Sequence, residues 1–126
     1  MADYMEIFLA KIEAKKTRQE NLLRDMARLQ KTVANHFKIP MADLFVKQRS
    51  GELVHPRHIA FFIAKEHLYY SFQEIGPCFR RDPTTIIHAY YKIKKQIDED
   101  PALRETITSL VNQLTPRLVP DALTQG

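Results

Sequence analysis

The 126-residue sequence has few of the residues that support disulfide-rich, β-rich or membrane-spanning proteins. It holds a single cysteine, Cys78, which excludes an intrachain disulfide and fits a reducing cytoplasm. Only 3 glycines occur, and no segment sustains the polar–apolar alternation of a β-strand. No apolar run approaches the roughly 20 residues that span a bilayer, and the N-terminus lacks the pattern of a secretory signal. These absences favour an all-helical protein of the cytoplasm.

The charge of the chain is weakly positive and unevenly distributed. In total, 19 lysines and arginines face 15 aspartates and glutamates, for a net charge of +4. Residues 1–37 hold 7 basic and 5 acidic residues, residues 38–95 hold 10 and 5, and residues 96–126 hold 2 and 5. The excess of positive charge therefore lies in the central segment, as is typical of a surface that binds phosphates.

Apolar periodicity and breakers divide the chain into short helical segments. We expect helices over residues 3–37, 41–45, 56–68, 71–79, 83–97 and 102–114. The first is expected to be interrupted near residues 15–21, because the stretch KKTRQEN is too hydrophilic for a continuous packed face. Pro56 is expected in the first turn of its helix, where its missing N–H costs nothing. That helix is apolar nearly all round, so we expect it at the buried centre.

Two neighbouring segments have the pattern of a helix-turn-helix. Ser71 and Glu74 predict a capping box at the start of the first helix. Asp82 predicts the N-cap of the second, with Pro83 as its first helical residue. The second helix has an apolar face formed by Ile86, Tyr90, Ile93 and Ile97. Its opposite, polar face consists of Thr85, His88, Lys92 and Lys95. In such a motif the first helix braces the second, which presents its N-terminal end to the DNA major groove.

The same stretch resembles a known family. IGPCFRRDPTTIIHAYYKI, over Ile75–Ile93, is similar to IGxxFxxRDHTTVxHAxxKI, the signature of the C-terminal DNA-binding domain of the bacterial replication initiator DnaA. The upstream stretch TVANHFKIPMADLFVKQRSGELVHPRHIAFFIAKE follows that family too. The resemblance implies an all-α helix-turn-helix domain of the DnaA C-terminal, Trp-repressor-like type, with an added N-terminal helix. It divides the chain into a helical extension (1–28), a DNA-binding domain (29–115) and a tail (116–126).

The resemblance also implies which residues contact DNA. The start of the recognition helix is expected to contact DNA through Asp82, Pro83, Thr84, Thr85 and His88, with Thr84 and Thr85 reading bases. The basic loop is expected to place Arg49 in the minor groove, beside Lys47, Ser50 and Arg57. Phosphate contacts are expected from Lys65, Arg80, Arg81, Lys92 and Lys95. The residues alone leave simpler roles open: Asp82 as a cap only, the threonines as partners of first-turn N–H groups, and each exposed base as a solvated side chain.

Several features depart from the family pattern. Pro83 replaces a histidine that helps to read bases, which is expected to relax or alter base preference. Gln48, Gly51 and Glu52 stand where the family has basic residues, so a weaker minor-groove contact is expected. No GxxxxGK[ST] motif occurs, so no nucleotide and no other cofactor is expected. The five histidines and Cys78 lack metal-ligand spacing, and no catalytic constellation is found.

Two functions remain open at this level. The leading interpretation is a stand-alone, non-enzymatic protein that binds double-stranded DNA at DnaA-box-like sites in the nucleoid and regulates replication initiation or transcription. The alternative is an interaction protein whose N-terminal helix binds DnaA or a second copy, with weak or vestigial DNA binding. Pro83 and Glu52 favour this alternative, as does the apolar face of the N-terminal segment, formed by Met5, Phe8, Leu9 and Ile12. A membrane partner is not expected.

Overall fold

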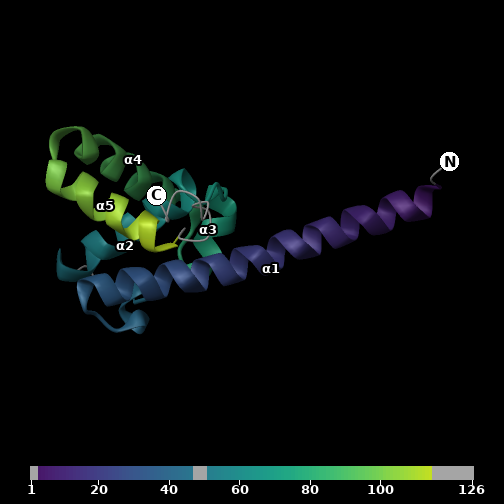
Figure 1. Cartoon of the computed structure of the whole chain (residues 1–126), viewed down its shortest axis with the longest axis horizontal. Coiled ribbons are helices and arrows are strands. Elements are labelled where there is room, and N and C mark those ends of the chain that lie inside the picture. The colour runs from purple at the N-terminus through teal and green to yellow at the C-terminus, as the bar shows by residue number, and fades with distance from the viewer. Residues whose placement is uncertain (1–2, 47–50, 115–126) are drawn as a thin grey trace, which may run out of the picture.

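The computed structural model describes residues 3–46 and 51–114, and the side chains among these other than those of residues 51–54. The described residues form an all-α domain, which confirms the expected fold class (Figure 1). Its elements are α1 (Tyr4–Phe37), the 3₁₀ helix η1 (Met41–Leu44), α2 (Gly51–Glu66), α3 (Phe72–Cys78), α4 (Pro83–Glu99) and α5 (Pro101–Leu114). Within the described part of the chain, no helix is both long and apolar enough to cross a membrane.

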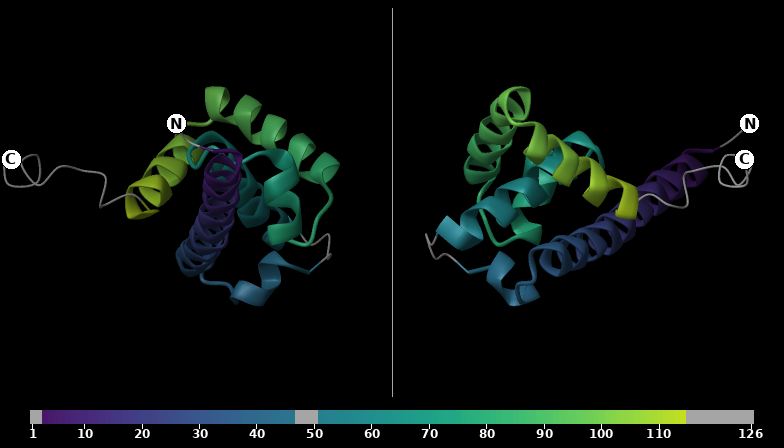
Figure 2. Two further views of the ribbon diagram at one scale, coloured as in Figure 1. Left: turned by 90° about the vertical axis from the view of Figure 1, so that its right-hand side faces the viewer. Right: turned by 60° about the vertical axis from the view of Figure 1, so that its left-hand side comes forward.

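Helix α1 is continuous over 34 residues, and its N-terminal half projects away from the other helices (Figures 1 and 2). It begins where the Asp3 carboxylate accepts hydrogen bonds from the N–H groups of Met5 and Glu6. It ends at Lys38, whose φ of 57° places it in the left-handed region. The expected interruption near residues 15–21 is wrong. That stretch holds no glycine or proline, and its polar side chains are compatible with a helix that is exposed there.

The core forms around α2, as its composition predicts. Every residue from Ile59 to Ala64 is buried. The C-terminal half of α1 packs against α2 and α5, and its buried side chains include Leu22, Met26, Leu29 and Val33. Helix α5 contributes the buried residues Leu103, Ile107, Leu110 and Leu114. Residues 3–20 of α1 are all exposed and take no part in this core.

Two boundaries differ from the sequence-based expectation. Helix α2 begins at Gly51, so Pro56 lies one turn inside the helix and not in its first turn. Proline removes only one hydrogen bond this close to the N-terminus, and Pro56 is buried, so packing compensates for the lost bond. The segment after Pro40 is a single 3₁₀ turn. The three C-terminal helices begin and end within two residues of their predicted bounds.

Candidate nucleic-acid interface

The turn between α3 and α4 is built on a close backbone contact at Gly76. A Cβ atom at this position would lie 2.6 Å from the carbonyl oxygen of Arg81 and 3.4 Å from the nitrogen of Pro83. The carbonyl of Gly76 also accepts a hydrogen bond of 2.9 Å from the N–H of Arg81. Only glycine therefore allows α3 to pack directly against the start of α4, and this contact fixes the angle between the two helices.

Both helices of the motif begin at the predicted caps. The Ser71 hydroxyl accepts from the N–H of Glu74 at 3.1 Å, and the Glu74 carboxylate accepts from the N–H of Ser71 at 2.9 Å. Asp82 accepts from the N–H of Thr85 at 3.3 Å, with Pro83 as the first helical residue. The predicted capping box and N-cap are confirmed. Asp82 therefore has a structural role whether or not it also meets a base.

Helix α4 presents its predicted polar face to solvent. Its buried face comprises Ile86, Ala89, Tyr90 and Ile93. Its exposed face comprises Thr84, Thr85, His88, Lys92 and Lys95, whereas Pro83 is half-buried. The threonines occupy the first turn, where unpaired N–H groups and the helix dipole give a positive potential. This end of α4 combines short side chains with positive potential, as a helix that enters the major groove requires.

Two arginines with predicted DNA contacts hold the backbone at the end of η1. The guanidinium groups of Arg57 and Arg81 both donate to the carbonyl of Val46. Arg81 donates to the carbonyl of Phe45 as well, at 3.2 Å. Arg57 is only 5% exposed, and burial together with the charge of Arg81 lowers its pKa. The two side chains thus tie the segment after η1 to α2 and to the turn before α4.

Val46 directly precedes the basic loop of the sequence. The predicted loop contacts Lys47, Arg49 and Ser50 lie outside the described residues. Arg57 and Arg81 nevertheless fix the point from which that loop departs, because both bind the carbonyl of Val46. The loop therefore starts beside the turn that leads into α4.

The other predicted phosphate contacts lie in the turn before α4, at the end of α2 and along α4. Arg80 is exposed, and its guanidinium lies 5.5 Å from the ring centroid of Phe45. Lys65 is half-buried, with Nζ 4.8 Å from the ring centroid of Phe72, a cation–π contact. Burial and the charge of Lys92 lower the pKa of His58 on α2 to about 4, so His58 is neutral at pH 7.

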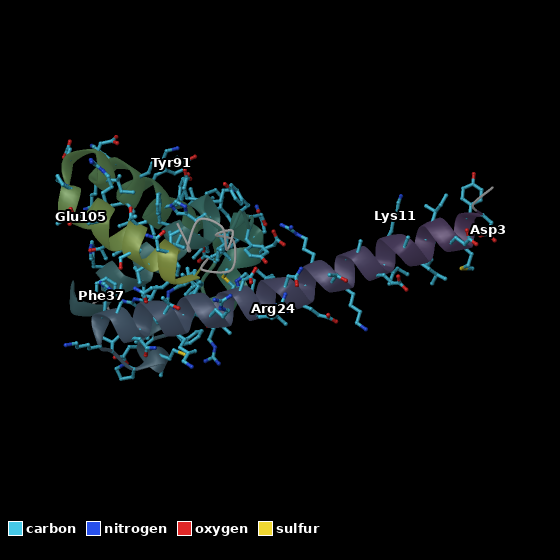
Figure 3. The ribbon with its side chains drawn as sticks, viewed as in Figure 1. Asp3, Lys11, Arg24, Phe37, Tyr91 and Glu105 are labelled. Atoms are coloured by element: carbon cyan, nitrogen blue, oxygen red, sulfur yellow. The ribbon has the colours of Figure 1, made fainter. Side chains whose placement is uncertain are left out.

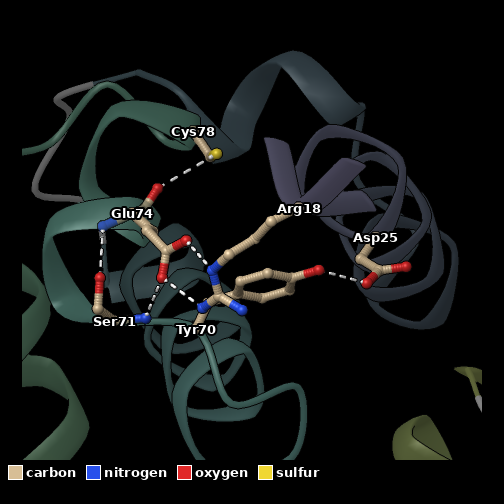
Figure 4. A network of polar contacts seen from close by, with 6 residues as sticks. All are labelled: Arg18, Asp25, Tyr70, Ser71, Glu74 and Cys78. Carbon is tan, nitrogen blue, oxygen red and sulfur yellow. Dashed lines mark hydrogen bonds and ion pairs between the residues drawn. The ribbon is translucent and has the colours of Figure 1, made fainter. Parts of the chain in front are cut away.

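Sequence reasoning missed a polar network that joins α1 to the helix-turn-helix (Figure 4). The guanidinium of Arg18 donates to both carboxylate oxygens of Glu74, at 2.8 and 2.9 Å. Next to it, the Tyr70 hydroxyl donates to Asp25 at 2.6 Å. Arg18 lowers the pKa of Glu74, whereas burial and Asp25 raise the pKa of Tyr70. The partners are far apart in the sequence, so no local pattern signals them.

Helix α1 also supports the other end of α3. Gln30 is only 5% exposed, and its side-chain amide donates to the carbonyl of Cys78 at 2.9 Å. This bond satisfies one of the carbonyl groups that the end of a helix leaves unpaired. Because Arg18 binds the start of α3 and Gln30 binds its end, α1 braces the helix that in turn braces α4.

Comparison with known proteins decides what this arrangement is. The family model described as "Bacterial dnaA protein helix-turn-helix" matches residues 26–93, which is more than half of the chain. The chain belongs to the DnaA helix-turn-helix family. By family it is therefore a DNA-binding domain. The match spans the C-terminal third of α1, η1, α2, α3 and the N-terminal two thirds of α4.

Individual relatives agree with this assignment. The chain is 40% identical over 87 residues to the chromosomal replication initiator protein DnaA of Buchnera aphidicola subsp. Cinara cedri (strain Cc). That stretch is 68% of this chain and 20% of the relative, so the chain matches about a fifth of the relative's length. A solved structure, titled as the crystal structure of a DNA replication initiation factor, shares the fold with a TM-score of 0.76 at 21% identity. The aligned part is 90% of this chain and 36% of the chain in that solved structure.

The likeness in fold extends further towards the N-terminus than the match to the DnaA family model. A structural match over 90% of the chain must include part of residues 3–20, because the chain without them is too short.

The turn before α4 differs from the DnaA signature, in which two residues separate the phenylalanine from the arginine. Here Arg80 alone separates Phe79 from Arg81, and its φ of 56° is left-handed, which is uncommon for a residue with a side chain.

Proposed function

We propose that this DnaA-family domain binds double-stranded DNA sequence-specifically, at DnaA-box-like sites in the nucleoid. The observation that carries the proposal is the first turn of α4. There Thr84 and Thr85 are exposed, next to an N-terminus that Asp82 caps and Gly76 positions. In the major groove, threonine methyl groups contact thymine methyls and the hydroxyls bond base edges. Asp82 retains one carboxylate oxygen that is free to accept from a cytosine amine.

The remaining contacts divide by what they recognise. Arg80 in the turn before α4, and Lys92 and Lys95 further along its polar face, are exposed and are proposed to bind phosphates, as are Lys65 and His88. Lys47, Arg49 and Ser50 are proposed to contact the minor groove. For Arg57 and Arg81 we propose a positioning role, because their guanidiniums already bind the backbone before the loop. Phosphate contacts set affinity, and the base contacts set sequence preference.

We further propose that the chain regulates replication initiation or transcription. The stretch of this chain that aligns with the DnaA relative is about a fifth of that relative's length. No nucleotide-binding motif occurs in the sequence. A domain of this kind occupies a site without the ATP-dependent chemistry of a P-loop protein. Occupancy of shared sites is then the simplest route by which it affects DnaA or a promoter.

The test is a competition titration on two duplexes, one holding a DnaA box and one a scrambled sequence of the same composition. At one fixed salt concentration, the box is expected to bind more tightly. The affinity for both duplexes is expected to fall with salt, because phosphate contacts release counterions. A slope near zero would exclude the phosphate contacts. Equal affinities would exclude sequence-specific recognition by α4.

A second candidate function is supported by a separate observation. Residues 3–20 of α1 are all exposed and include several large apolar side chains. We infer that this segment binds a protein partner, either DnaA or a second copy of the chain. If the two duplexes bind equally, protein interaction becomes the main function and DNA binding is weak or vestigial.

A further inference from the structure

The largest exposed apolar surface of the described residues lies at the free end of α1. Six of the eleven exposed large apolar side chains fall within its first nine residues. They are Tyr4, Met5, Ile7, Phe8, Leu9 and Ile12. Figure 3 shows this part of the helix, around the labelled Lys11, with no other element beside it. Monomeric proteins rarely expose so many neighbouring apolar side chains, and such surfaces usually bind a partner.

A helix of this kind also needs a partner for its own stability. Most helical stability in proteins comes from packing of an apolar face, and short isolated helices are marginal in water. The first tertiary side-chain contact of α1 is that of Arg18 with Glu74. Before that point, the described part of the chain buries no side chain of α1, so a partner molecule would supply its packing. The question is which molecule the surface fits.

The apolar face is self-complementary. Met5, Phe8, Leu9 and Ile12 follow the spacing i, i+3, i+4, i+7 and share one side of the helix. This spacing reads the same in both directions from a point between Phe8 and Leu9. A two-fold axis through that point places Met5 of one copy on Ile12 of the other, and Phe8 on Leu9. A symmetric dimer requires such a self-complementary surface, because the same patch on each copy forms the interface.

The charges favour an antiparallel arrangement of the two copies. Asp3 and Glu6 lie at the start of this segment, whereas Lys11, Lys15 and Lys16 outnumber Glu13 at its other end. Lys15 and Lys16 stand three and four residues after Ile12, so they continue the same side of the helix. A parallel pair would place each lysine next to the same lysine of the other chain, and the two positive charges would repel each other. An antiparallel pair about the axis between Phe8 and Leu9 instead separates the two copies of Lys16 by about 22 Å along the helix axis.

The free part of α1 is long enough for this pairing. Residues 4–20 rise about 25 Å along the helix axis. With the two-fold axis between Phe8 and Leu9, the second copy's helix begins level with Glu13. It therefore ends before the globular part, where Leu22 enters the core. The two copies of Leu22 would lie about 40 Å apart, so the two domains stand at opposite ends of the pair.

We propose that two copies of this chain pair in antiparallel through Met5, Phe8, Leu9 and Ile12 of α1. The proposal deepens the second function given above by naming the partner, and its test does not use DNA. The mass of the full chain is measured by sedimentation equilibrium up to the highest soluble concentration. Phe8→Glu places a charge in the apolar face. Ile7→Glu is the matched control, since Ile7 is also exposed but points to the opposite side of the helix.

The expected result is a concentration-dependent dimer for the natural chain and for Ile7→Glu. Phe8→Glu is expected to raise the dimer dissociation constant by at least about tenfold. Neither substitution should alter urea unfolding of the domain, because both side chains are exposed in the single chain. A monomer at all concentrations, a species larger than a dimer, or an equal effect of both substitutions would overturn the proposal.

Orientation is tested by crosslinking. Met5→Cys and Ile12→Cys are made separately in a Cys78→Ser background, and each is oxidised alone and in a mixture. An antiparallel pair brings position 5 of one copy to position 12 of the other, so the mixed disulfide should form fastest. Faster formation of the like-with-like disulfides would show a parallel pair and overturn the proposed geometry.

Discussion

The backbone of Gly76 packs so closely on Arg81 that a Cβ atom at position 76 would stand 2.6 Å from the Arg81 carbonyl oxygen. The obstructing atom belongs to the backbone, so no side-chain rotation relieves the clash. We expect Gly76→Ala to destabilise the domain by about 1–3 kcal/mol, although alanine favours helices. We also expect weaker DNA binding, because the start of α4 must shift. Urea unfolding and a duplex titration measure the two effects.

Pro77→Ala is the control for Gly76→Ala. Pro77 lies in the same helix and is exposed, so this change should affect stability and binding little. If Gly76→Ala leaves both properties unchanged, then the Gly76–Arg81 contact does not set the position of α4.

Arg57 offers a test between a structural and a DNA-contacting role. Arg57→Met keeps the buried stem and removes the charged donor to the Val46 carbonyl. We expect a loss of about 1.5–3 kcal/mol in the free energy of unfolding, as for a hydrogen bond to a charged group. Arg81→Met should behave similarly, and the double variant should deviate from additivity because both donors share one acceptor. If Arg57→Met unfolds like the natural chain but binds DNA less tightly, Arg57 contacts DNA directly.

The N-terminal segment should be dispensable for folding. Deleting residues 1–16 removes no described side chain that is buried, and it leaves Arg18 paired with Glu74. We expect the shortened chain to keep its thermal unfolding midpoint and its DNA affinity and to lose self-association. Deletion of residues 1–26 is the comparison, because it removes the buried Leu22 and Met26 and should prevent folding. Loss of the folded state on the shorter deletion would show that the segment belongs to the core.

Local signals predicted the helix-turn-helix well, and long-range contacts explain what they missed. The starts of α3 and α4 follow from Ser71 and Asp82, because a cap acts on the three residues that follow it. The start of α2 was predicted wrongly from Pro56, because proline is favoured in the first turn of a helix but is also tolerated slightly deeper in it. The bond from Arg57 to Val46 depends on how η1 folds back onto α2, and a sequence pattern for surface DNA contacts does not contain that information.

His58 should make stability depend on pH. Burial and nearby positive charges lower its pKa in the folded state to about 4, below the ordinary value of 6.5. As pH falls below about 6.5, the unfolded chain binds a proton at His58 that the folded chain does not take up until near pH 4. Stability is therefore fully present above pH 6.5 and declines between 6.5 and 4. His58→Gln should make that decline shallower, as measured by urea unfolding across the range.

The control for His58→Gln is His36→Gln, which changes an exposed histidine at the end of α1. This comparison separates the effect of replacing a half-buried histidine from that of replacing a histidine at the surface. His67 is also expected to contribute, because burial lowers its pKa in the same direction. A His58→Gln profile parallel to that of the natural chain would show that His58 binds protons equally in both states.

The first turn of α4 decides whether this domain reads sequence. Thr84 and Thr85 are exposed, and replacing both with alanine keeps helix propensity and leaves the Asp82 cap intact. Stability should change little. Affinity for a DnaA box should fall by roughly 1–3 kcal/mol per lost contact, whereas affinity for scrambled duplex should stay the same. Thr108→Ala, an exposed threonine on α5, is the matched control and should alter neither.

Pro83→His tests the same turn in the opposite direction, since it restores the residue of the DnaA signature. Histidine supplies a ring nitrogen that can donate to a base edge, which proline cannot do. We therefore expect a larger ratio of box to scrambled affinity for Pro83→His than for the natural chain, and a smaller one for the double alanine variant. All three proteins are compared in one competition titration at fixed salt. Equal ratios would mean that α4 binds DNA without reading it, and the interaction through α1 would then carry the function.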